Sequence, residues 1–361
     1  MPLGLYIHIP FCHGKCPYCD FYSVFPDGKL IDKYVKTVCE QLKKREDYKF
    51  DTVYFGGGTP SVMGAESIAL ILKHANTTVN PEITVECNPS DCGDGGFDFG
   101  KAAEAGVNRV SFGLQSSVDS ERKALGRRAS ANDVKTAVRR ARNAGIDNIT
   151  LDLMLGIPGQ NTDSLKNSID FCYESGAKHI SAYILKIEEG TYFYKKKETL
   201  NLPDDDETAD LYLRCVDLIE QGGMKQYEIS NFSFSGFESK HNLKYWHCEE
   251  YLGIGPAAHS FINGKRYYYE RNLADYITEP KAVYDGTGGD FEEYAMLALR
   301  LGEGLQDGRV FKRFGFHIPS KIIKKAKKYE NNGFAVIKDD SISLTAKGFL
   351  VSNTIIGELL A

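Results

Sequence analysis

The sequence lacks the features that mark membrane-embedded, secreted and repeat proteins. No run of about 18 or more apolar residues is present, so no membrane-spanning helix is predicted. Residues 1–10 contain no basic segment followed by an apolar one, so no secretory signal is predicted and a cytoplasmic location is expected. No repeat of about 20 to 50 residues is visible, which argues against a solenoid.

The sequence also has no excess of basic residues. Its 44 Lys and Arg residues stand against 49 Asp and Glu residues, which gives a formal net charge of -5. Proteins that bind nucleic acids neutralise phosphate groups with a basic surface, so no nucleic-acid partner is expected. With 361 residues, 42% hydrophobic and 26% charged, the chain is predicted to be globular, with one large and one smaller domain.

Cysteines are present in an odd number. Nine of them do not suit a complete disulfide framework. In a reducing compartment, closely spaced cysteines more often hold a metal or carry out redox chemistry. The spacing of the cysteines is therefore more informative than their number.

Short apolar segments alternate with amphipathic segments over most of the chain. This alternation predicts a parallel sheet covered by helices. Six such units are too few for a closed eight-stranded barrel, so the prediction is an α/β fold with an open (β/α)6 partial TIM barrel rather than a doubly wound sheet. The strands are predicted at residues 5–9, 52–55, 83–86, 109–114, 149–154 and 180–185, and the helices at 31–47, 65–74, 97–104, 131–143, 162–174 and 206–221.

Three regions are predicted from this pattern. Residues 1–230 form the partial barrel, with an edge strand at 226–230. Residues 231–290 are rich in Tyr, Phe, Asn and Gly without a clear period, which predicts a loop-rich connection. Residues 291–361 are predicted to form a small α+β, winged-helix-like domain, with helices at 292–301 and 320–331 and strands at 334–337 and 341–344.

Three cysteines follow the first predicted strand directly. Cys12, Cys16 and Cys19 stand in the segment C-H-G-K-C-P-Y-C. A loop can curl so that three thiolates meet at one inorganic centre, and an iron-sulfur cube held this way keeps one iron free for a small molecule. The alternative is a structural zinc site, which would need a fourth ligand such as His8 or His13.

Polar residues and glycines also follow or end the other strands. Gly56, Gly57 and Gly58 precede Thr59, and glycines allow a backbone to approach a ligand closely. Buried polar side chains in strands need partners, and an internal ion pair of Asp152 with Arg127 is one alternative to a ligand. Because the carboxyl ends of parallel strands form one face, the following residues are expected on the same rim: the cysteines, the glycine turn, Glu86, Gln115 and Asp152.

Taken together, these segments resemble the oxygen-independent coproporphyrinogen dehydrogenase-like branch of the radical S-adenosylmethionine (SAM) proteins over nearly the whole chain. The carrying motifs are L-Y-I-H-I-P-F-C-H-G-K-C-P-Y-C, G-G-G-T-P, E-C-N-P, S-F-G-L-Q, L-G-R and D-L-M-L-G-I-P-G-Q. The resemblance implies a [4Fe-4S] cluster on Cys12, Cys16 and Cys19, from which one electron would pass to SAM. It implies a SAM site formed by Tyr6, Tyr18, Gly57, Gly58, Thr59, Glu86, Gln115, Arg127 and Asp152.

Two departures favour the haem chaperone branch of this family. The oxidising members have a further cysteine two residues past the third ligand, where this chain has Asp20 and Phe21, and they extend further before the first strand. The haem chaperone branch has an H-N-x-x-Y-W motif, which matches residues 241–246. The resemblance therefore implies haem binding by His241, Asn242, Tyr245 and Trp246. The alternative is a segment that packs its aromatic rings onto the barrel end, with the histidine hydrogen-bonded.

The expected function is that of a haem chaperone that carries the cluster and SAM and passes haem to an unidentified acceptor protein. A second hypothesis is an oxygen-independent coproporphyrinogen III dehydrogenase, and a third is a binding protein with a structural metal. The sequence does not decide whether SAM is turned over. If the protein is an enzyme, it would be a SAM-cleaving oxidoreductase of porphyrin metabolism. Expected partners are haem, its acceptor and an electron donor, with membrane contact only through a partner; a homodimer is left open.

Overall fold

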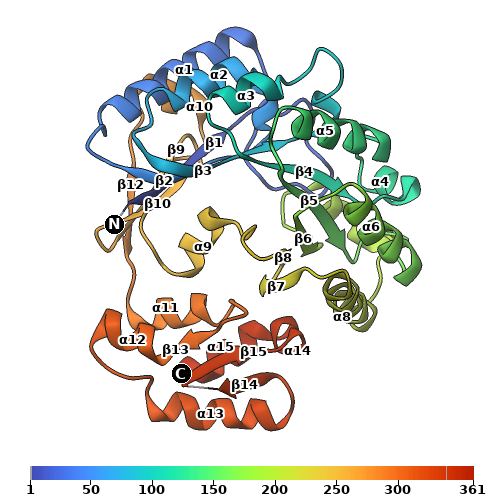
Figure 1. Cartoon of the computed structure of the whole chain (residues 1–361), viewed down its shortest axis with the longest axis vertical. Coiled ribbons are helices and arrows are strands. Elements are labelled where there is room, and N and C mark those ends of the chain that lie inside the picture. Colours follow the sequence, from blue (N-terminus) through green and yellow to red (C-terminus); the bar gives the residue numbers. More distant parts are fainter. Residues whose placement is uncertain (1, 339) are drawn as a thin grey trace.

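The computed structural model describes residues 2–338 and 340–361 (Figure 1). Its larger part is built on a 12-stranded sheet in the order β12-β11-β10-β9-β1-β2-β3-β4-β5-β6-β8-β7. Strands β1 to β6 are parallel and adjacent in chain order, with helices on their outer face. A sheet wound in one direction without closing is a partial barrel, so the predicted open (β/α)6 architecture is confirmed.

The predicted strands and helices of the barrel are present, with bounds shifted by a few residues. The strands are β1 (Leu3–Ile9), β2 (Phe50–Gly57), β3 (Thr77–Cys87), β4 (Arg109–Gln115), β5 (Asn148–Leu155) and β6 (His179–Ile184). The predicted helices are α1 (Gly28–Lys43), α2 (Gly64–Leu72), α3 (Phe99–Glu104), α5 (Ala131–Asn143), α6 (Thr162–Glu174) and α8 (Asp205–Gln221). Two short helices that were not predicted, α4 (Asp119–Ala124) and α7 (Tyr192–Lys196), are also present.

Local capping determines where several of these helices begin. Ser130 and Asp133 form a capping box at the start of α5, and Asn161 and Ser164 form one at the start of α6. A side-chain oxygen that accepts from a free backbone N–H stabilises the first turn. Helix α1 begins before the predicted residue 31 because Asp27 accepts from the Leu30 N–H.

The prediction of a loop-rich connection over residues 231–290 is wrong. This segment contains β8 (Asn231–Ser233), α9 (Lys240–Trp246), β9 (Tyr251–Ile254), β10 (His259–Ile262), β11 (Lys265–Tyr268), α10 (Leu273–Thr278) and β12 (Val283–Thr287). Strand β9 pairs parallel to β1 and extends the sheet beyond its first strand. Strands of three to five residues are too short to show a period of two, which is why the pattern was not visible.

The predicted edge strand at residues 226–230 is also different in the structure. Strand β7 (Lys225–Glu228) turns back into β8 as an antiparallel hairpin, and β8 pairs antiparallel with β6. The open barrel is therefore flanked by antiparallel strands at both edges. Helix α9 lies between the barrel and the C-terminal part of the chain (Figure 1).

Residues 291–361 form the small α+β unit that the sequence predicts. It contains α11 (Phe291–Ala298), β13 (Leu305–Gln306), α12 (Asp307–Phe314), α13 (Ser320–Asn331), β14 (Ala335–Lys338), β15 (Ser341–Leu344), α14 (Ala346–Leu350) and α15 (Ser352–Leu360). Its three strands pair in the order β13-β15-β14. The unit is joined to the barrel by polar contacts, since Ile229 N–H donates to Arg300 O at 3.0 Å and Arg313 donates to the carbonyls of His247 and Cys248.

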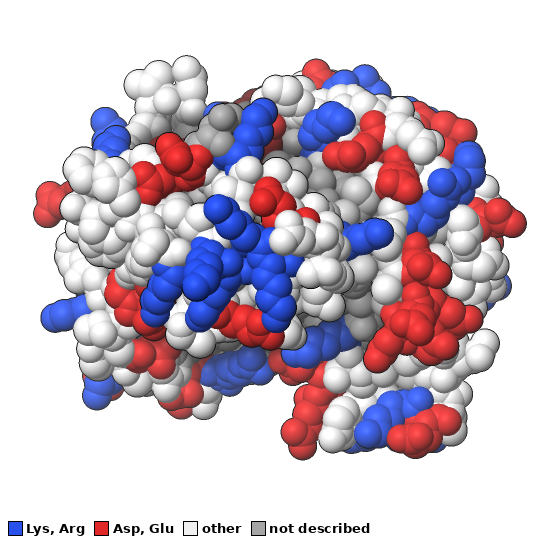
Figure 2. Space-filling model, turned by 90° about the horizontal axis from the view of Figure 1, so that it is seen from below, with Lys and Arg blue, Asp and Glu red and all other residues white. Residues whose placement is uncertain are grey.

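Helix α13 of the C-terminal unit carries a group of exposed lysines. Helix α13 is the lowest element in Figure 1 and faces the viewer in Figure 2, where Lys and Arg side chains gather. Lys321, Lys324, Lys327 and Lys328 are exposed there. Within the described ranges, no helix combines the length and the hydropathy that a bilayer crossing requires.

Candidate functional site

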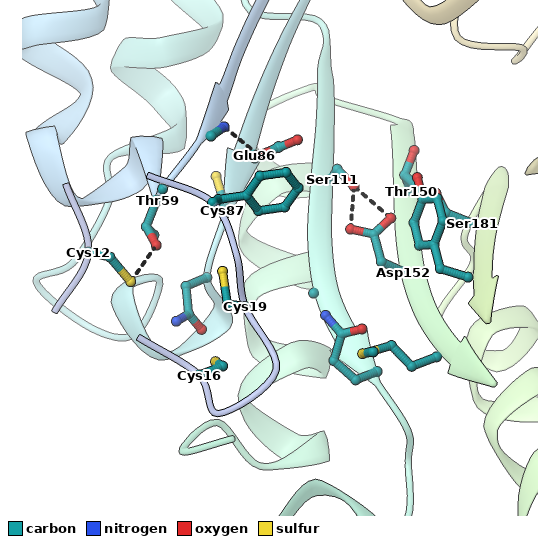
Figure 3. A pocket seen from close by; sticks show the side chains of 18 of the residues that line it. Cys12, Cys16, Cys19, Thr59, Glu86, Cys87, Ser111, Thr150, Asp152 and Ser181 are labelled. Atoms are coloured by element: carbon teal, nitrogen blue, oxygen red, sulfur yellow. Dashed lines mark hydrogen bonds between the residues drawn. The ribbon is translucent and has the colours of Figure 1, made fainter. Parts of the chain in front are cut away.

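One cavity of about 410 Å³ occupies the interior of the open barrel and its rim (Figure 3). Side chains from β2 to β6 and from the cysteine loop after β1 line it. It brings together most of the predicted site residues, namely Cys12, Cys16, Tyr18, Cys19, Gly57, Gly58, Thr59, Glu86, Gln115, Arg127, Asp152 and Asn242. The other predicted residues, Tyr6, His241, Tyr245 and Trp246, lie outside its lining.

The three cysteines lie on one loop beside the cavity (Figure 3). The Cys12 N–H donates to Val24 O at 3.0 Å, and Thr59 Oγ1 lies 3.4 Å from Cys12 Sγ. Arg127 Nη1 lies 3.7 Å from Cys16 Sγ. Three half-buried thiols on one loop are a donor set that fits an iron-sulfur cluster.

The thiols are not yet arranged as a ligand set. Across residues 2–338 and 340–361, no three His, Cys, Asp or Glu side chains are grouped as metal coordination requires. The cysteine side chains would therefore turn toward one another on binding a cluster. His8 does not provide a fourth zinc ligand, because its Nδ1 contacts Tyr6 Oη at 3.1 Å and its Nε2 contacts Tyr22 O at 3.0 Å.

The glycine turn after β2 holds the cysteine loop by its backbone. Gly58 N–H donates to Ile9 O at 2.8 Å, and Thr59 N–H donates to Phe11 O at 2.7 Å. A Cβ on Gly58 would lie 2.6 Å from Phe11 O, which no side chain tolerates. These two N–H groups are therefore not available to a ligand.

Glu86 is the last residue but one of β3 and lies beside the glycine turn. Tyr54 Oη donates to its Oε1 at 2.7 Å, and Gly57 N–H donates to its Oε2 at 3.2 Å. Burial raises the pKa of Glu86 to about 7, partly offset by these two hydrogen bonds. A carboxylate held in this way is suited to accept hydrogen bonds from a cationic group.

Asp152 and Arg127 do not form the ion pair that was one alternative. Ser111 Oγ donates to both oxygens of Asp152, at 3.1 and 3.0 Å (Figure 3). Arg127 instead donates to Gly113 O at 2.8 Å. Burial raises the pKa of Asp152. Its carboxyl group, like that of Glu86, is therefore held by neutral donors at the cavity wall.

The end of β4 is strained where it meets the rim. Gln115 has φ of 66° in the left-handed region, and the register with β5 shifts between Gly113 and Gln115. This backbone conformation costs about 1 to 2 kcal/mol for a residue with a side chain. Such strain at a cavity rim is typical of functional sites.

The two predicted tyrosines lie in different layers. Tyr18 lines the cavity and packs on Phe193, with ring centroids 6.2 Å apart. Tyr6 lies behind the lining, where its ring is 6.3 Å from that of Tyr54 and 6.5 Å from that of His241. Direct contact of Tyr6 with a ligand in the cavity is therefore not supported by this geometry.

The H-N-L-K-Y-W segment forms α9, and its histidine is fully buried. His241 is 0% exposed; its Nδ1 lies 2.8 Å from Thr52 Oγ1 and its Nε2 lies 2.7 Å from Tyr245 Oη. Burial lowers the pKa of His241 to about 3. Neither ring nitrogen can bind an iron in this conformation, which matches the packing alternative. Coordination of haem by His241 would require α9 to move, and Asn242 alone of the motif lines the cavity.

Several cavity residues were missed by the sequence analysis. They are Tyr54, Arg109, Ser111, Thr150, His179, Ser181, Tyr183 and Ser239. On β4, β5 and β6 they occupy alternate positions, because alternate side chains of a strand face the same side. Counting back by twos from Asp152 on β5 would have found Thr150, but the facing positions on β4 and β6 require the register between the strands.

We expect His241→Ala to lower the free energy of unfolding by about 2 to 4 kcal/mol, because Thr52 and Tyr245 would lose a buried partner and a cavity would form. The loss is measured by urea denaturation. Since burial keeps His241 neutral in the folded state, wild-type stability attributable to this group should fall as the pH drops below 6.5, and the variant should lack that component.

The matched control is His259→Ala, which removes an exposed imidazole that stacks on Tyr268. It should change the free energy of unfolding by less than about 0.5 kcal/mol. Wild-type stability in the His241 variant would contradict the structural role of this residue.

Comparisons with known proteins agree with the fold and the cavity. A family model described as the Radical SAM superfamily matches residues 6–172. The chain is 34% identical to the heme chaperone HemW of Bacillus subtilis (strain 168), over 98% of each chain. It is 38% identical to the heme chaperone HemW of Haemophilus influenzae, over 72% of this chain and 70% of the relative.

A solved structure shares the fold over almost the whole chain. The coproporphyrinogen III oxidase HemN from Escherichia coli superposes with a TM-score of 0.83 at 18% identity, covering 99% of this chain and 90% of that one. This likeness concerns the fold, whereas the whole-length identity to the HemW proteins concerns the family. The chain therefore belongs to the radical SAM superfamily, in the branch of the proteins named heme chaperone HemW.

Proposed function

We propose that this protein is a haem chaperone, which binds haem and passes it to an acceptor protein. The observation that carries the proposal is the identity of 34% and 33% to two proteins named heme chaperone HemW, with matches that span 98% and 99% of this chain. The cavity in the open barrel, with its thiols and polar wall, is the place where its cofactors would bind.

In this proposal Cys12, Cys16 and Cys19 hold a [4Fe-4S] cluster, and SAM lies across the rim. When bound, the cluster supplies an electron to SAM. Glu86 accepts from the ammonium group of SAM, and Asp152 accepts from ribose hydroxyls. Arg127 lies between β4 and the cysteine loop, where its guanidinium can pair with the SAM carboxylate while it contacts Cys16.

A second candidate function is oxidation of coproporphyrinogen. The E. coli protein whose solved structure shares the fold is named a coproporphyrinogen III oxidase. Against it, the position two residues past Cys19 is Phe21, a side chain that is 66% exposed beside the cavity. No thiol is available there for the further cysteine that the resemblance associates with the oxidising branch. The chaperone function is therefore preferred.

We further propose that the protein acts in the cytoplasm with an electron donor and a haem acceptor, and that it meets a membrane only through that acceptor. Each helix of the described chain is too short or too polar to cross a bilayer, which is compatible with this location. The H-N-L-K-Y-W segment remains the sequence-based proposal for haem contact, with Asn242 already placed at the cavity.

Binding of SAM is expected to depend on pH through Glu86. With a pKa of about 7 in the free protein, Glu86 is largely protonated at pH 5.5 and half ionised at pH 7, and a cationic ligand prefers the ionised form. We expect affinity for SAM to rise about tenfold over this range in calorimetric titrations of the anaerobically reconstituted protein. Glu86→Gln should remove the dependence.

Glu66→Gln is the control, since Glu66 is an exposed carboxylate paired with Lys101 on the surface and should leave the dependence intact. The same rise of affinity in Glu86→Gln as in the wild type would exclude Glu86 as the responsible group.

The two candidate functions predict different products. The reconstituted protein is expected to give a Soret band with haem, at lower haem concentration than an albumin control, and to form no protoporphyrinogen from coproporphyrinogen III. In His241→Ala the position of the band should be unchanged, because both ring nitrogens of His241 are occupied by Thr52 and Tyr245. Formation of protoporphyrinogen, or haem binding no tighter than that of the control, would reject the chaperone proposal.

A further inference from the structure

The inner end of the cavity contains a buried guanidinium that the cluster and SAM do not use. Arg109 is the first residue of β4, lines the cavity and is 2% exposed. Its Nη1 donates to Phe237 O at 2.9 Å and its Nη2 donates to Thr150 Oγ1 at 2.8 Å. These partners are neutral, and the Nε has no hydrogen-bond partner in the described chain.

The positive charge of Arg109 is only partly compensated by the protein. Asp152 is an acidic group of the same cavity wall, but its oxygens accept from Ser111, and burial raises its pKa. No ion pair of the described residues includes Arg109, although its charge acts on Asp152 at longer range and opposes the rise of that pKa. A buried charge without a paired counter-ion is costly, and an anion brought by a ligand would remove that cost.

A second unused donor lies beside Arg109. His179 lines the cavity, is 1% exposed, and pairs in register with Thr150, the residue that Arg109 contacts. Its Nε2 lies 2.8 Å from Tyr227 Oη, which also accepts from the Ser239 N–H at 3.2 Å. With the phenol proton directed to Nε2, the hydrogen of the neutral ring would be on Nδ1, where it could be donated to a ligand. Nδ1 has no partner in the described chain.

This end of the cavity is well separated from the rim where SAM is proposed to bind. Arg109 and Gln115 are the first and last of the 7 residues of β4, which span about 20 Å. Arg127, the guanidinium proposed for the SAM carboxylate, contacts Gly113 near the rim. Arg109 and Gly113 are four residues apart on β4, about 13 Å along the strand, so an anion beside Arg109 would occupy a position distinct from one beside Arg127.

The charges of the cavity favour a singly charged group. Two carboxyl groups, Glu86 and Asp152, share the wall with Arg109 and Arg127, so a phosphate would meet repulsion as well as attraction. A carboxylate carries one charge and accepts two hydrogen bonds in one plane, which matches a guanidinium.

We propose that Arg109, together with Thr150 and His179, forms a subsite at the inner end of the cavity that binds a carboxylate arm of a ligand. The identity of that arm rests on the proposed function, because haem carries propionate side chains that could reach inward from a porphyrin at the cavity mouth. The amino-acid carboxylate of SAM is the other source. In both cases a carboxylate would pair with the guanidinium of Arg109.

The test compares Arg109→Gln and Arg109→Lys with the wild type, using the reconstituted full-length protein. The probes are protoporphyrin IX, its dimethyl ester, haem and SAM, and affinities are measured by fluorescence quenching, the Soret band and calorimetry. Protoporphyrin IX has no iron, so it reports carboxylate recognition separately from iron binding. Arg139→Gln, the same change at an exposed position of α5, is the matched control, and thermal melting verifies folding.

Arg109→Gln is expected to weaken binding of protoporphyrin IX and haem by roughly 10- to 100-fold, since a hydrogen-bonded charge pair is lost. Arg109→Lys should show a smaller loss, because the charge stays but the planar fork does not. The dimethyl ester should bind the wild type and Arg109→Gln equally weakly, and SAM should bind all variants equally. A loss confined to SAM would reject a propionate arm as the occupant of the subsite.

The inference is overturned if folded Arg109 variants bind every probe like the wild type, or if the wild type binds the ester as tightly as the free acid. The comparison of the ester with the free acid uses only the wild type, so it tests the proposal even where the Arg109 variants do not fold. Haem binding that is indifferent to Arg109 would reject the subsite and leave the chaperone proposal intact. If protoporphyrin IX binds in a way that depends on Arg109 but haem does not bind, the chaperone proposal would be rejected and the subsite would be supported.

Discussion

The crossing of the cysteine loop over the glycine turn is the contact on which the site depends. Two backbone hydrogen bonds, from Gly58 N–H to Ile9 O and from Thr59 N–H to Phe11 O, hold the end of β1 against the end of β2. The approach is so close that a Cβ at Gly58 would meet two carbonyl oxygens. This contact places three thiols beside a polar cavity. The position of the cysteine loop is therefore fixed by its hydrogen bonds to the sheet.

Several polar side chains of the barrel wall are held by hydrogen bonds to one another. Tyr54 donates to Glu86, Ser111 to Asp152, and Arg109 to Thr150. These bonds hold charged and hydroxyl groups in place without filling the space between the strands. The result is a cavity with a carboxyl-rich rim and a guanidinium at its inner end, which suits ligands that carry both cationic and anionic groups.

In helix α9, neighbouring residues of the H-N-L-K-Y-W motif face different surroundings. His241 bonds Thr52 and Tyr245, and its N–H donates to Glu82, so the first part of the motif anchors the helix under the barrel. Asn242, the next residue, points to a different environment and lines the cavity. A motif shared by a family can thus combine a packing role with a binding role in neighbouring residues, and spacing alone does not separate them.

The sequence by itself determined the strand and helix order of the barrel and most of the rim. Capping boxes such as Ser130 with Asp133 are local signals, and the carboxyl ends of parallel strands always share one face. Only the tertiary structure decided the short strands β9 to β12, the partners of His241 and the inner wall with Arg109 and His179. The reason is physical: β9 pairs with β1, and Thr52 bonds His241, across about half of the chain or more, and no local pattern encodes such distant contacts.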